Sequence, residues 1–509
     1  MSLARTFGIS LSGLRGEAID IEVDVSNGLP TYSLLGLPDA TLNESRDRIR
    51  AAILNSNRSW PNKKITVSLS PAWLPKSGSS FDLAISLAIL AASGQLDPVK
   101  LESIFFLGEL SLEGLLRPIR GVLPILIAAR EHGIRRVVVP AENFQEARLL
   151  KDLEVVALSN FTSVLQFLET GEQQVQPSLM QIGSEANSPN PQVDMSEVSG
   201  HNLTKFALQI AAAGGHHLLM IGAPGCGKTM LAERLPTILP PLDETESIEV
   251  AGIHSIAGTL NDGAILNPLP PFIAPHHSTT IPAMVGGGSG AIRPGACSLA
   301  HNGVLFIDEA PECANGVLDS LRQPLESGKI TITRSQTTTT YPARFILLLA
   351  ANPCPCGKYA GRGRGCECTS LQVRRYLAKL SGPLLDRIDL RVNVLAPTRV
   401  ELTDDHPLPS SALREQVILA RETAASRFAE FNFKLNSEIP PTLLRGRFRP
   451  KKEALSKLHA MIDNETLSAR GFHRTIRTSW SIADLKGLDL PGVDEVELAL
   501  SLRAGSPGE

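Results

Sequence analysis

One eight-residue segment constrains the fold of this chain more than any other feature. An apolar run, HLLMI, precedes the segment and a helical pattern, MLAERL, follows it, which is the strand–loop–helix setting of a phosphate-binding loop. Glycines in such a loop let backbone N–H groups surround a β-phosphate at a helix N-terminus that favours anions. We therefore predict an α/β domain that binds a nucleoside triphosphate through Gly222, Ala223, Pro224, Gly225, Cys226, Gly227, Lys228 and Thr229.

Two side chains of this loop and two later acids define a hydrolytic site. We expect the Lys228 charge to face the β- and γ-phosphates and the Thr229 hydroxyl to bind Mg²⁺. Further along, an apolar strand, GVLFI, ends in Asp308 and Glu309, at the kind of strand end where α/β sheets bind ligands. Asp308 would hold Mg²⁺ through water, and Glu309 would polarise the attacking water. Such a pair alone is often a solvated strand end, but the upstream loop favours the catalytic interpretation.

Two later polar residues are candidates for contacts with the γ-phosphate. The strand FILLLAA ends in Asn352, which would orient the lytic water unless it is an ordinary amide in the turn before Pro353. Arg387 lies between Asp386 and Asp389. It either pairs with one of these acids or reaches the γ-phosphate of a neighbouring subunit, where it would stabilise the charge of the transition state.

The last part of the chain carries three arginines on one helical face. Arg470, Arg474 and Arg477 are spaced at i, i+4 and i+7, and residues with this spacing share a face of a helix. Either one of them contacts the nucleotide bound by the same chain, or the three form a solvated basic stripe.

Charge and composition exclude several classes of protein. With 49 Lys and Arg against 52 Asp and Glu, the net charge of −3 gives no general attraction to nucleic acid, so such a contact needs a local basic patch. Segments 358–364 and 445–452 are two such patches, unless they are only solvated loops. No signal peptide or membrane-spanning pattern is visible, and seven cysteines in 509 residues favour a reducing compartment. We expect a cytoplasmic protein without a membrane partner.

The pattern of apolar residues divides the chain into domains. Strand-type and helical runs alternate in residues 1–170 and again in residues 197–397, which predicts two α/β domains. Residues 171–196 are polar and lack apolar periodicity, which predicts a flexible linker, with a long ordered surface loop as the alternative. Amphipathic helical segments dominate residues 398–509.

Four cysteines are clustered around one loop. Cys354 and Cys356 form one CxC pair, and Cys366 and Cys368 form another. In a reducing compartment such a cluster suggests a tetrahedral, structural Zn²⁺, because four thiolates leave no open position for chemistry. Reduced thiols and a redox pair are the alternatives.

A Pro- and Gly-rich insert occupies residues 267–295. We expect either a pore loop that presents His276 and His277 to the channel of a ring, or a loop that packs between subunits. Metal binding by the histidine pair is not expected, because adjacent side chains point apart and no carboxylate is nearby.

Several long motifs resemble those of one protein family. They are PFIAPHHS at 271–278, GGG at 286–288, PGACSLAHNGVLF at 294–306, LRQPLE at 321–326, NPCPCG at 352–357 and GPLLDRIDL at 382–390. With the phosphate-binding loop they are similar to the ComM/YifB family of AAA+ ATPases, which is related to the magnesium chelatase I subunit. The resemblance implies a central AAA+ αβα sandwich at 197–397 and a C-terminal helical lid domain at 398–509.

The same resemblance implies roles for single residues and for the whole protein. It makes Asn352 the sensor-1 residue, Arg387 the arginine finger and Arg477 the sensor-2 arginine. It also implies a homo-oligomeric ring, a hexamer, that uses ATP and Mg²⁺ and acts as a helicase in DNA branch migration during natural transformation. We therefore predict an ATP-hydrolysing motor that acts on single-stranded or branched DNA. An ATP-driven protein remodeller and a nucleotide switch without motor activity are the alternatives.

The N-terminal domain resembles the proteolytic domain of Lon proteases. KSGSS at 76–80, FLGELSLEG at 106–114 and VVVPAEN at 137–143 carry the match. Lon chemistry needs a lysine that takes the proton of the serine, and the corresponding stretch, 121–129, contains no lysine. We therefore expect Ser80 to be inert and residues 1–170 to form a non-catalytic interaction or assembly module, with a Lon-type protease as the rival.

Overall fold

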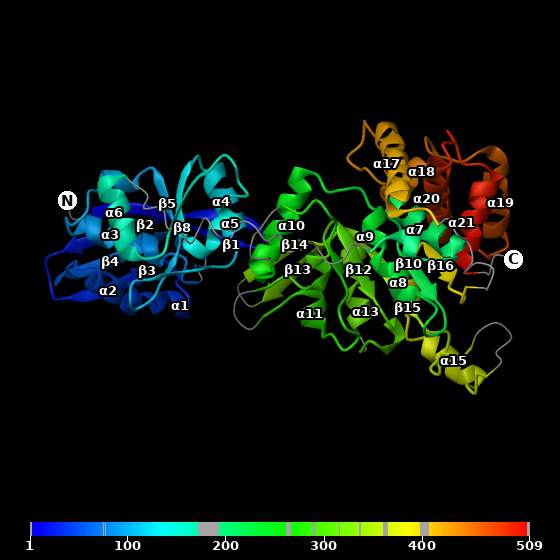
Figure 1. Cartoon of the computed structure of the whole chain (residues 1–509), viewed down its shortest axis with the longest axis horizontal. Coiled ribbons are helices and arrows are strands. Elements are labelled where there is room, and N and C mark those ends of the chain that lie inside the picture. The colour runs from blue at the N-terminus through cyan, green and yellow to red at the C-terminus, as the bar shows by residue number, and fades with distance from the viewer. Residues whose placement is uncertain are drawn as a thin grey trace.

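The protein consists of three parts that follow one another along its longest axis (Figure 1). The computed structural model describes residues 3–74, 76, 78–171, 193–260, 266–288, 292–314, 316–334, 337–359, 365–397 and 407–505. An α/β part lies at one end, a second α/β part built around a parallel sheet lies in the middle, and a helical part lies at the other end. The predicted α/β fold class is therefore confirmed.

The N-terminal part combines two main sheets with a buried helix. One sheet has the strand order β1-β2-β4-β3 and the other, which is parallel, has the order β5-β8-β9. The strands are β1 (Leu3–Ser12), β2 (Arg15–Ser26), β3 (Thr31–Leu35), β4 (Lys64–Ser70), β5 (Ile104–Phe106), β6 (Glu109–Leu110), β7 (Leu116–Arg117), β8 (Arg136–Pro140) and β9 (Glu154–Leu158). The helices are α1 (Ala40–Asn43), α2 (Ser45–Asn55), α3 (Asp82–Ala92), α4 (Val122–Glu131), α5 (Phe144–Ala147) and α6 (Phe161–Thr170). Helix α3 is buried on every side, because its sequence is apolar all round.

The central part is a parallel five-stranded sheet in the order β11-β12-β15-β10-β16. Its strands are β10 (Leu218–Ile221), β11 (Phe272–Ile273), β12 (Gly303–Ile307), β15 (Phe345–Ala351) and β16 (Leu390–Asn393). Around it are α7 (Asn202–Gly214), α8 (Lys228–Glu233), α9 (Leu235–Ile238), α10 (Glu244–Ala257), α11 (Ile281–Val285), α12 (Ala296–Leu299), α13 (Val317–Ser320), α14 (Arg322–Ser327) and the hairpin of β13 (Lys329–Arg334) and β14 (Thr337–Pro342).

The two faces of this sheet bury separate cores. Along β15, Ile346 and Leu348 belong to one apolar cluster, whereas Leu347 and Leu349 belong to another. Because side chains alternate between the faces of a strand, both faces of the sheet must be covered. An apolar run without polar alternation is therefore the sequence signature of this αβα sandwich.

The helical part follows the last strand. It consists of α17 (Ser410–Arg427), α18 (Pro441–Arg445), α19 (Lys452–Asp463), α20 (Ala469–Leu485) and α21 (Val493–Ala504), whereas α15 (Ser370–Leu377) and α16 (Gly382–Leu385) lie between β15 and β16 in the chain. Helix α20 contacts α7, α17 and α21, so the helical part is joined to the central sheet through α7. Residues 407–505 contain no strand, as the sequence predicts. None of the described helices combines the length and the apolar character needed to cross a membrane.

The N-terminal part is docked on helix α10. The Ser255 hydroxyl of α10 donates to Glu146, and the backbone N–H of Gly121 donates to the Ser255 carbonyl at 3.3 Å. Ala251 of α10 is buried in an apolar cluster of the N-terminal part. Of the expected linker, residues 172–192 lie outside the described residues, whereas Met195 is fully buried in the core of the central part.

Candidate nucleotide-binding site

The predicted phosphate-binding loop joins the end of β10 to the start of α8. The backbone N–H of Gly222 donates to the carbonyl of Ala351, the last residue of β15, at 3.1 Å. A Cβ atom on Gly222 would lie 2.6 Å from the Cys226 sulfur and closer still to the Val394 carbonyl, so only glycine fits there. Gly225 and Gly227 have φ angles of +76° and +88°, which glycine adopts freely. The loop therefore has the backbone freedom that a phosphate cradle needs.

Lys228 connects this loop to the end of the neighbouring strand. Its Nζ atom donates to the Gly222 carbonyl at 2.7 Å, to the Ala223 carbonyl at 3.0 Å and to Oδ1 of Asn352 at 3.2 Å. The Lys228 side chain is almost entirely buried. Asn352 directly follows β15, which lies beside β10 in the sheet. The structure thus brings together the lysine and the amide that the sequence proposes for phosphate and water.

The two expected Mg²⁺ ligands are also in contact. The Thr229 hydroxyl donates to Oδ2 of Asp308 at 2.7 Å, and Oδ1 of Asp308 accepts the backbone N–H of Glu309 at 2.8 Å. A hydroxyl and a carboxylate at this distance offer Mg²⁺ two oxygen ligands. Glu309 itself has a φ angle of +48°, a left-handed conformation that is uncommon for residues other than glycine and is often found at functional sites.

The histidine pair of the insert reaches this site, which corrects both of the reasons given above against metal binding by the pair. Nδ1 of His277 lies 3.2 Å from Oε2 of Glu309, so a carboxylate is nearby. The rings of His276 and His277 do not point apart: their centroids are 4.0 Å from each other. Sequence spacing gave no signal for the contact with Glu309, because it depends on the path of the chain after β11.

Arg387 lies at the amino ends of the sheet's strands, opposite the carboxyl ends where the phosphate-binding loop lies. Strand β16 starts at Leu390, which is paired with Leu218 at the start of β10, so Arg387 lies at the amino edge, whereas the phosphate-binding loop follows the carboxyl end of β10. Its guanidinium is nearly buried, and it donates to the Pro383 carbonyl at 2.7 Å and to Glu326. Neither of the two acids that flank it in sequence is its partner in these bonds.

Two of the three α20 arginines join the Arg387 cluster. Arg470 donates to Asp386 at 2.7 Å and to Glu326 at 3.2 Å. Arg474 donates to the Arg387 carbonyl at 2.8 Å and forms an ion pair with Asp389. Burial would raise the pKa of the Asp389 carboxyl, yet Arg474 and His216 hold that pKa well below its usual range. Charged partners and burial therefore fix this edge of the sheet.

Arg477, the third of these arginines, points elsewhere. Its Nε and one terminal nitrogen donate to the Ile439 carbonyl at 2.9 and 2.6 Å. The guanidinium is thus held within the helical part, and its sensor role stays a prediction. The regular spacing of the three arginines predicted that they share one helix. It could not predict that the guanidinium of Arg477 binds the Ile439 carbonyl.

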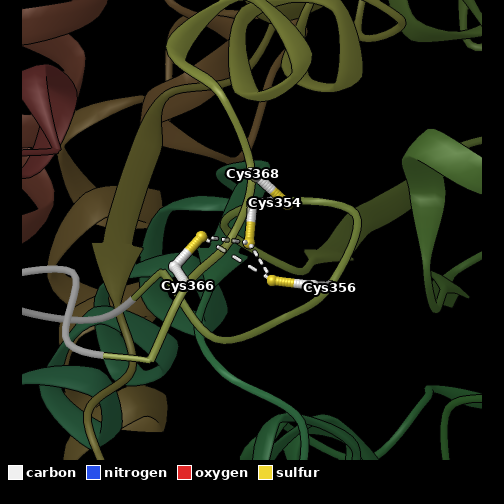
Figure 2. Close-up of side chains that lie close together, drawn as sticks. All are labelled: Cys354, Cys356, Cys366 and Cys368. Carbon is white, nitrogen blue, oxygen red and sulfur yellow. Dashed lines mark hydrogen bonds between the residues drawn. The ribbon is translucent and has the colours of Figure 1, made fainter.

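The four clustered cysteines form a compact group (Figure 2). Their sulfur atoms all lie within 4.8 Å of one another, and the Sγ of Cys354 is 3.3 Å from that of Cys356 and 3.7 Å from that of Cys366. Sulfurs that are each about 2.3 Å from a single zinc lie about 3.8 Å apart in a regular tetrahedron. The donor set therefore fits one tetrahedral metal ion.

The structure describes only part of the basic segment 358–364 but all of the basic segment 445–452. Residues 360–364 of the first lie outside the described residues. In the second, Arg447 pairs with Glu430 at 2.6 Å and lies over the Phe431 ring at 5.4 Å. The remaining charges of this segment are exposed, at Arg445, Arg449, Lys451 and Lys452.

The N-terminal serine does not acquire a lysine partner from the neighbouring motif. Lys76 is buried, burial lowers its pKa, and its ammonium donates to the Pro71 carbonyl. The adjacent Ser79 hydroxyl donates to Glu109. Among the described residues, no lysine is hydrogen-bonded to the Ser80 hydroxyl, and the non-catalytic role of this domain stays a prediction.

Family profiles match most of the chain. The profile described as magnesium chelatase, subunit ChlI, matches residues 194–402. That described as subunit ChlI of Mg-chelatase matches residues 21–143, and that described as magnesium chelatase, subunit ChlI C-terminal, matches residues 408–503.

Relatives of the same length extend these matches. An uncharacterized protein of Mycobacterium tuberculosis is 46% identical over 505 residues, 99% of either chain. Competence protein ComM of Haemophilus influenzae is 41% identical over 96% of this chain and 94% of its own. The uncharacterized protein YifB of Escherichia coli is 39% identical over 99% of this chain and 97% of its own. A shorter match, 33% identity over 96 residues, is to Lon protease 2 of Bacillus subtilis, of which it covers 17%.

Proposed function

The chain belongs to the ComM/YifB family of magnesium-chelatase-like AAA+ ATPases, and we propose that it is a ring-forming helicase or translocase that acts on DNA. The main support for ATP hydrolysis is that residues at the ends of β12 and β15 both contact the phosphate-binding loop. Lys228 meets Asn352 at 3.2 Å, and Thr229 meets Asp308 at 2.7 Å. These contacts bring three separate sequence motifs to one edge of one sheet.

Each of these groups has one task in the proposed hydrolysis. Backbone N–H groups of residues 222–229 bind the phosphates of ATP, and Lys228 neutralises their charge. Thr229 and Asp308 hold Mg²⁺, which when bound offsets the charge that develops on the phosphates. Glu309 takes the proton of the attacking water, and Asn352 orients that water. The cofactors of the protein are then ATP and Mg²⁺, with a structural Zn²⁺ on the four cysteines.

Arg387 completes the site from a second subunit. It lies at the sheet edge opposite its own phosphate-binding loop, so it reaches a γ-phosphate when another copy presents one. A closed ring, which we propose to be a hexamer, gives each loop such a neighbour. Arg470 shares the partner Glu326 with Arg387, and Arg474 donates to the Arg387 carbonyl. The proposed sensor role of Arg477 requires its guanidinium to leave the Ile439 carbonyl.

DNA is the polymer that we propose this ring moves. The exposed arginines and lysines of residues 445–452 are suited to phosphate contacts, which are independent of sequence and sensitive to salt. The relative that is named for competence supports the same choice. We propose a cytoplasmic location, since all seven cysteines are free, and a non-catalytic assembly role for residues 1–170.

The deciding experiment is ATP turnover of the full-length protein with and without DNA. We expect single-stranded or branched DNA to raise turnover and high salt to abolish the increase. Glu309→Gln should bind ATP and hydrolyse it at least about a hundredfold more slowly, and normal turnover of this variant would mean that Glu309 is not the base. Turnover that DNA leaves unchanged would favour a protein remodeller, and the absence of multiple turnovers would favour a nucleotide switch.

A further inference from the structure

The cysteine cluster lies against the nucleotide site. Its first pair begins two residues after Asn352, and the turn that follows is closed by the backbone N–H of Gly357, which donates to the Cys354 carbonyl at 3.0 Å. A Cβ atom on Gly357 would lie 2.6 Å from the ring of Pro224. We call residues 354–357 and 365–368 the cysteine knuckle. The knuckle therefore packs directly on the phosphate-binding loop.

The second cysteine pair leads back to the same site. Helix α15 starts immediately after it, with the Thr369 side chain as its N-cap. The Tyr376 ring of this helix is buried, and burial followed by the nearby Glu312 charge raises its pKa to about 12. Tyr376 also lies beside the backbone of Asn352, and Lys379 pairs with Glu312 at 3.6 Å. Both ends of the knuckle are thus anchored at residues next to the hydrolytic site.

The two halves of the knuckle meet at their sulfur atoms. Cys354 is fully buried, but Cys356 is exposed and Cys366 and Cys368 are partly exposed. The sulfurs are not bonded to one another, since their closest approach, 3.3 Å, is far longer than a disulfide bond. Four sulfur atoms with this spacing can all bind one metal ion. A metal ion is therefore the natural cross-link of the knuckle.

We propose that the knuckle binds one Zn²⁺ and that this ion is a clamp on the nucleotide site, fixing Asn352 against Lys228 and Gly357 against Pro224. Four thiolates with sulfurs within 4.8 Å suit a single tetrahedral ion, whereas an iron–sulfur cluster would hold them further apart. The clamp rests on the proposed binding of ATP, while the metal site does not. Loss of the ion should loosen Asn352 and Pro224 together and weaken ATP binding.

The test measures metal and nucleotide separately on the full-length protein. Metal content is read by mass spectrometry, and affinity is read with a fluorescent ATP analogue and Mg²⁺. We expect about one zinc per chain in the wild type. Cys366→Ser and Cys368→Ser should lose zinc and bind the analogue about tenfold more weakly, the equivalent of one lost charge-assisted hydrogen bond. Glu367→Ser lies between the two cysteines and is exposed, so it should keep both properties.

A second measurement guards against variants that fail to fold. A mercurial compound first removes the metal from the wild type, and excess thiol then removes the mercurial. Zn²⁺ alone is added back while the affinity for the ATP analogue is measured. Recovery of affinity with zinc supports the clamp. Zinc loss without a change in affinity overturns the clamp, and a wild type that neither contains nor takes up zinc overturns the site. A zinc-loaded wild type that fails to bind ATP would instead refute the proposed function and leave the metal site standing.

Discussion

Replacing Arg387 by alanine should abolish hydrolysis without unfolding the protein. Without Arg387, the half-exposed Glu326 keeps its ion pair with Arg470, so the loss of this one nearly buried side chain should cost about 2 kcal/mol of stability. An arginine that stabilises the transition state of phosphoryl transfer is worth about 10³-fold or more in kcat, or about 4 kcal/mol. The catalytic loss should therefore far exceed the loss of stability, and the affinity for ATP should hardly change.

Mixing two inactive variants tests whether Arg387 acts on a neighbour. Subunits with Arg387→Ala retain Glu309, and subunits with Glu309→Gln retain Arg387. In a ring assembled at random from equal amounts, about one boundary in four places an intact Glu309 beside an intact Arg387 of the next subunit. The mixture should therefore recover about a quarter of the wild-type ATPase rate. The rate is followed by phosphate release after the subunits have been co-assembled.

The refuting result is a mixture no faster than the mean of its two parents, because an arginine that acts within its own chain cannot be supplied by a neighbour. Glu326→Gln is the matched control. It removes the ion-pair partner of Arg387 but keeps the arginine, so most of the activity should remain. If Glu326→Gln were as inactive as Arg387→Ala, the pair would have a structural role instead.

Three further predictions concern the site and its support. Gly222→Ala should destabilise the protein by about 1–3 kcal/mol through overpacking, which lowers the melting temperature, and it should weaken ATP binding. Gly382→Ala should do neither, because the added methyl group meets open space. Equal melting temperatures of the two variants would refute the steric argument. His277→Ala should lower kcat about tenfold at unchanged ATP affinity, because the Glu309 carboxylate loses the partner that orients it. His277→Gln should recover part of the rate. An unchanged kcat would show that the contact is irrelevant to hydrolysis. Asp389 has a folded pKa below its unfolded value of 3.8. Its contribution to the free energy of unfolding is therefore complete above pH 3.8 and is lost as the pH falls through the folded pKa. Asp389→Asn should reduce this loss of stability at acid pH, and an unchanged loss would assign it to other groups.

The parts of the site that the sequence predicts are those encoded by local patterns. The apolar runs before Gly222, Asp308 and Asn352 identify buried parallel strands, and parallel strands bring their carboxyl ends to one edge. This inference needs no knowledge of the loops between the strands. For that reason the sequence predicts that these strand ends lie near the phosphate-binding loop, although it does not predict the individual contacts of Lys228 and Thr229.

The contacts that escaped prediction depend on how distant segments meet. Glu326, the partner of Arg387, lies on α14, and nothing in the spacing of the two residues marks them as neighbours. The docking of Glu146 on Ser255 likewise depends on how two domains pack. The acids that flank Arg387 in sequence misled for the same reason, since Asp386 and Asp389 pair with arginines of α20 instead.

The direction of the central sheet explains why the proposed motor needs a ring. All five strands are parallel, so every strand end that offers a phosphate or water ligand lies on one edge, and every strand start lies on the other. Arg387 precedes a strand, its guanidinium donates to the Pro383 carbonyl and to Glu326, and its backbone carbonyl accepts from Arg474 of α20. A rotamer change cannot carry it across the sheet. The proposed hydrolysis depends on both edges and therefore requires a second copy of the chain, which would place the site of ATP cleavage where two subunits meet.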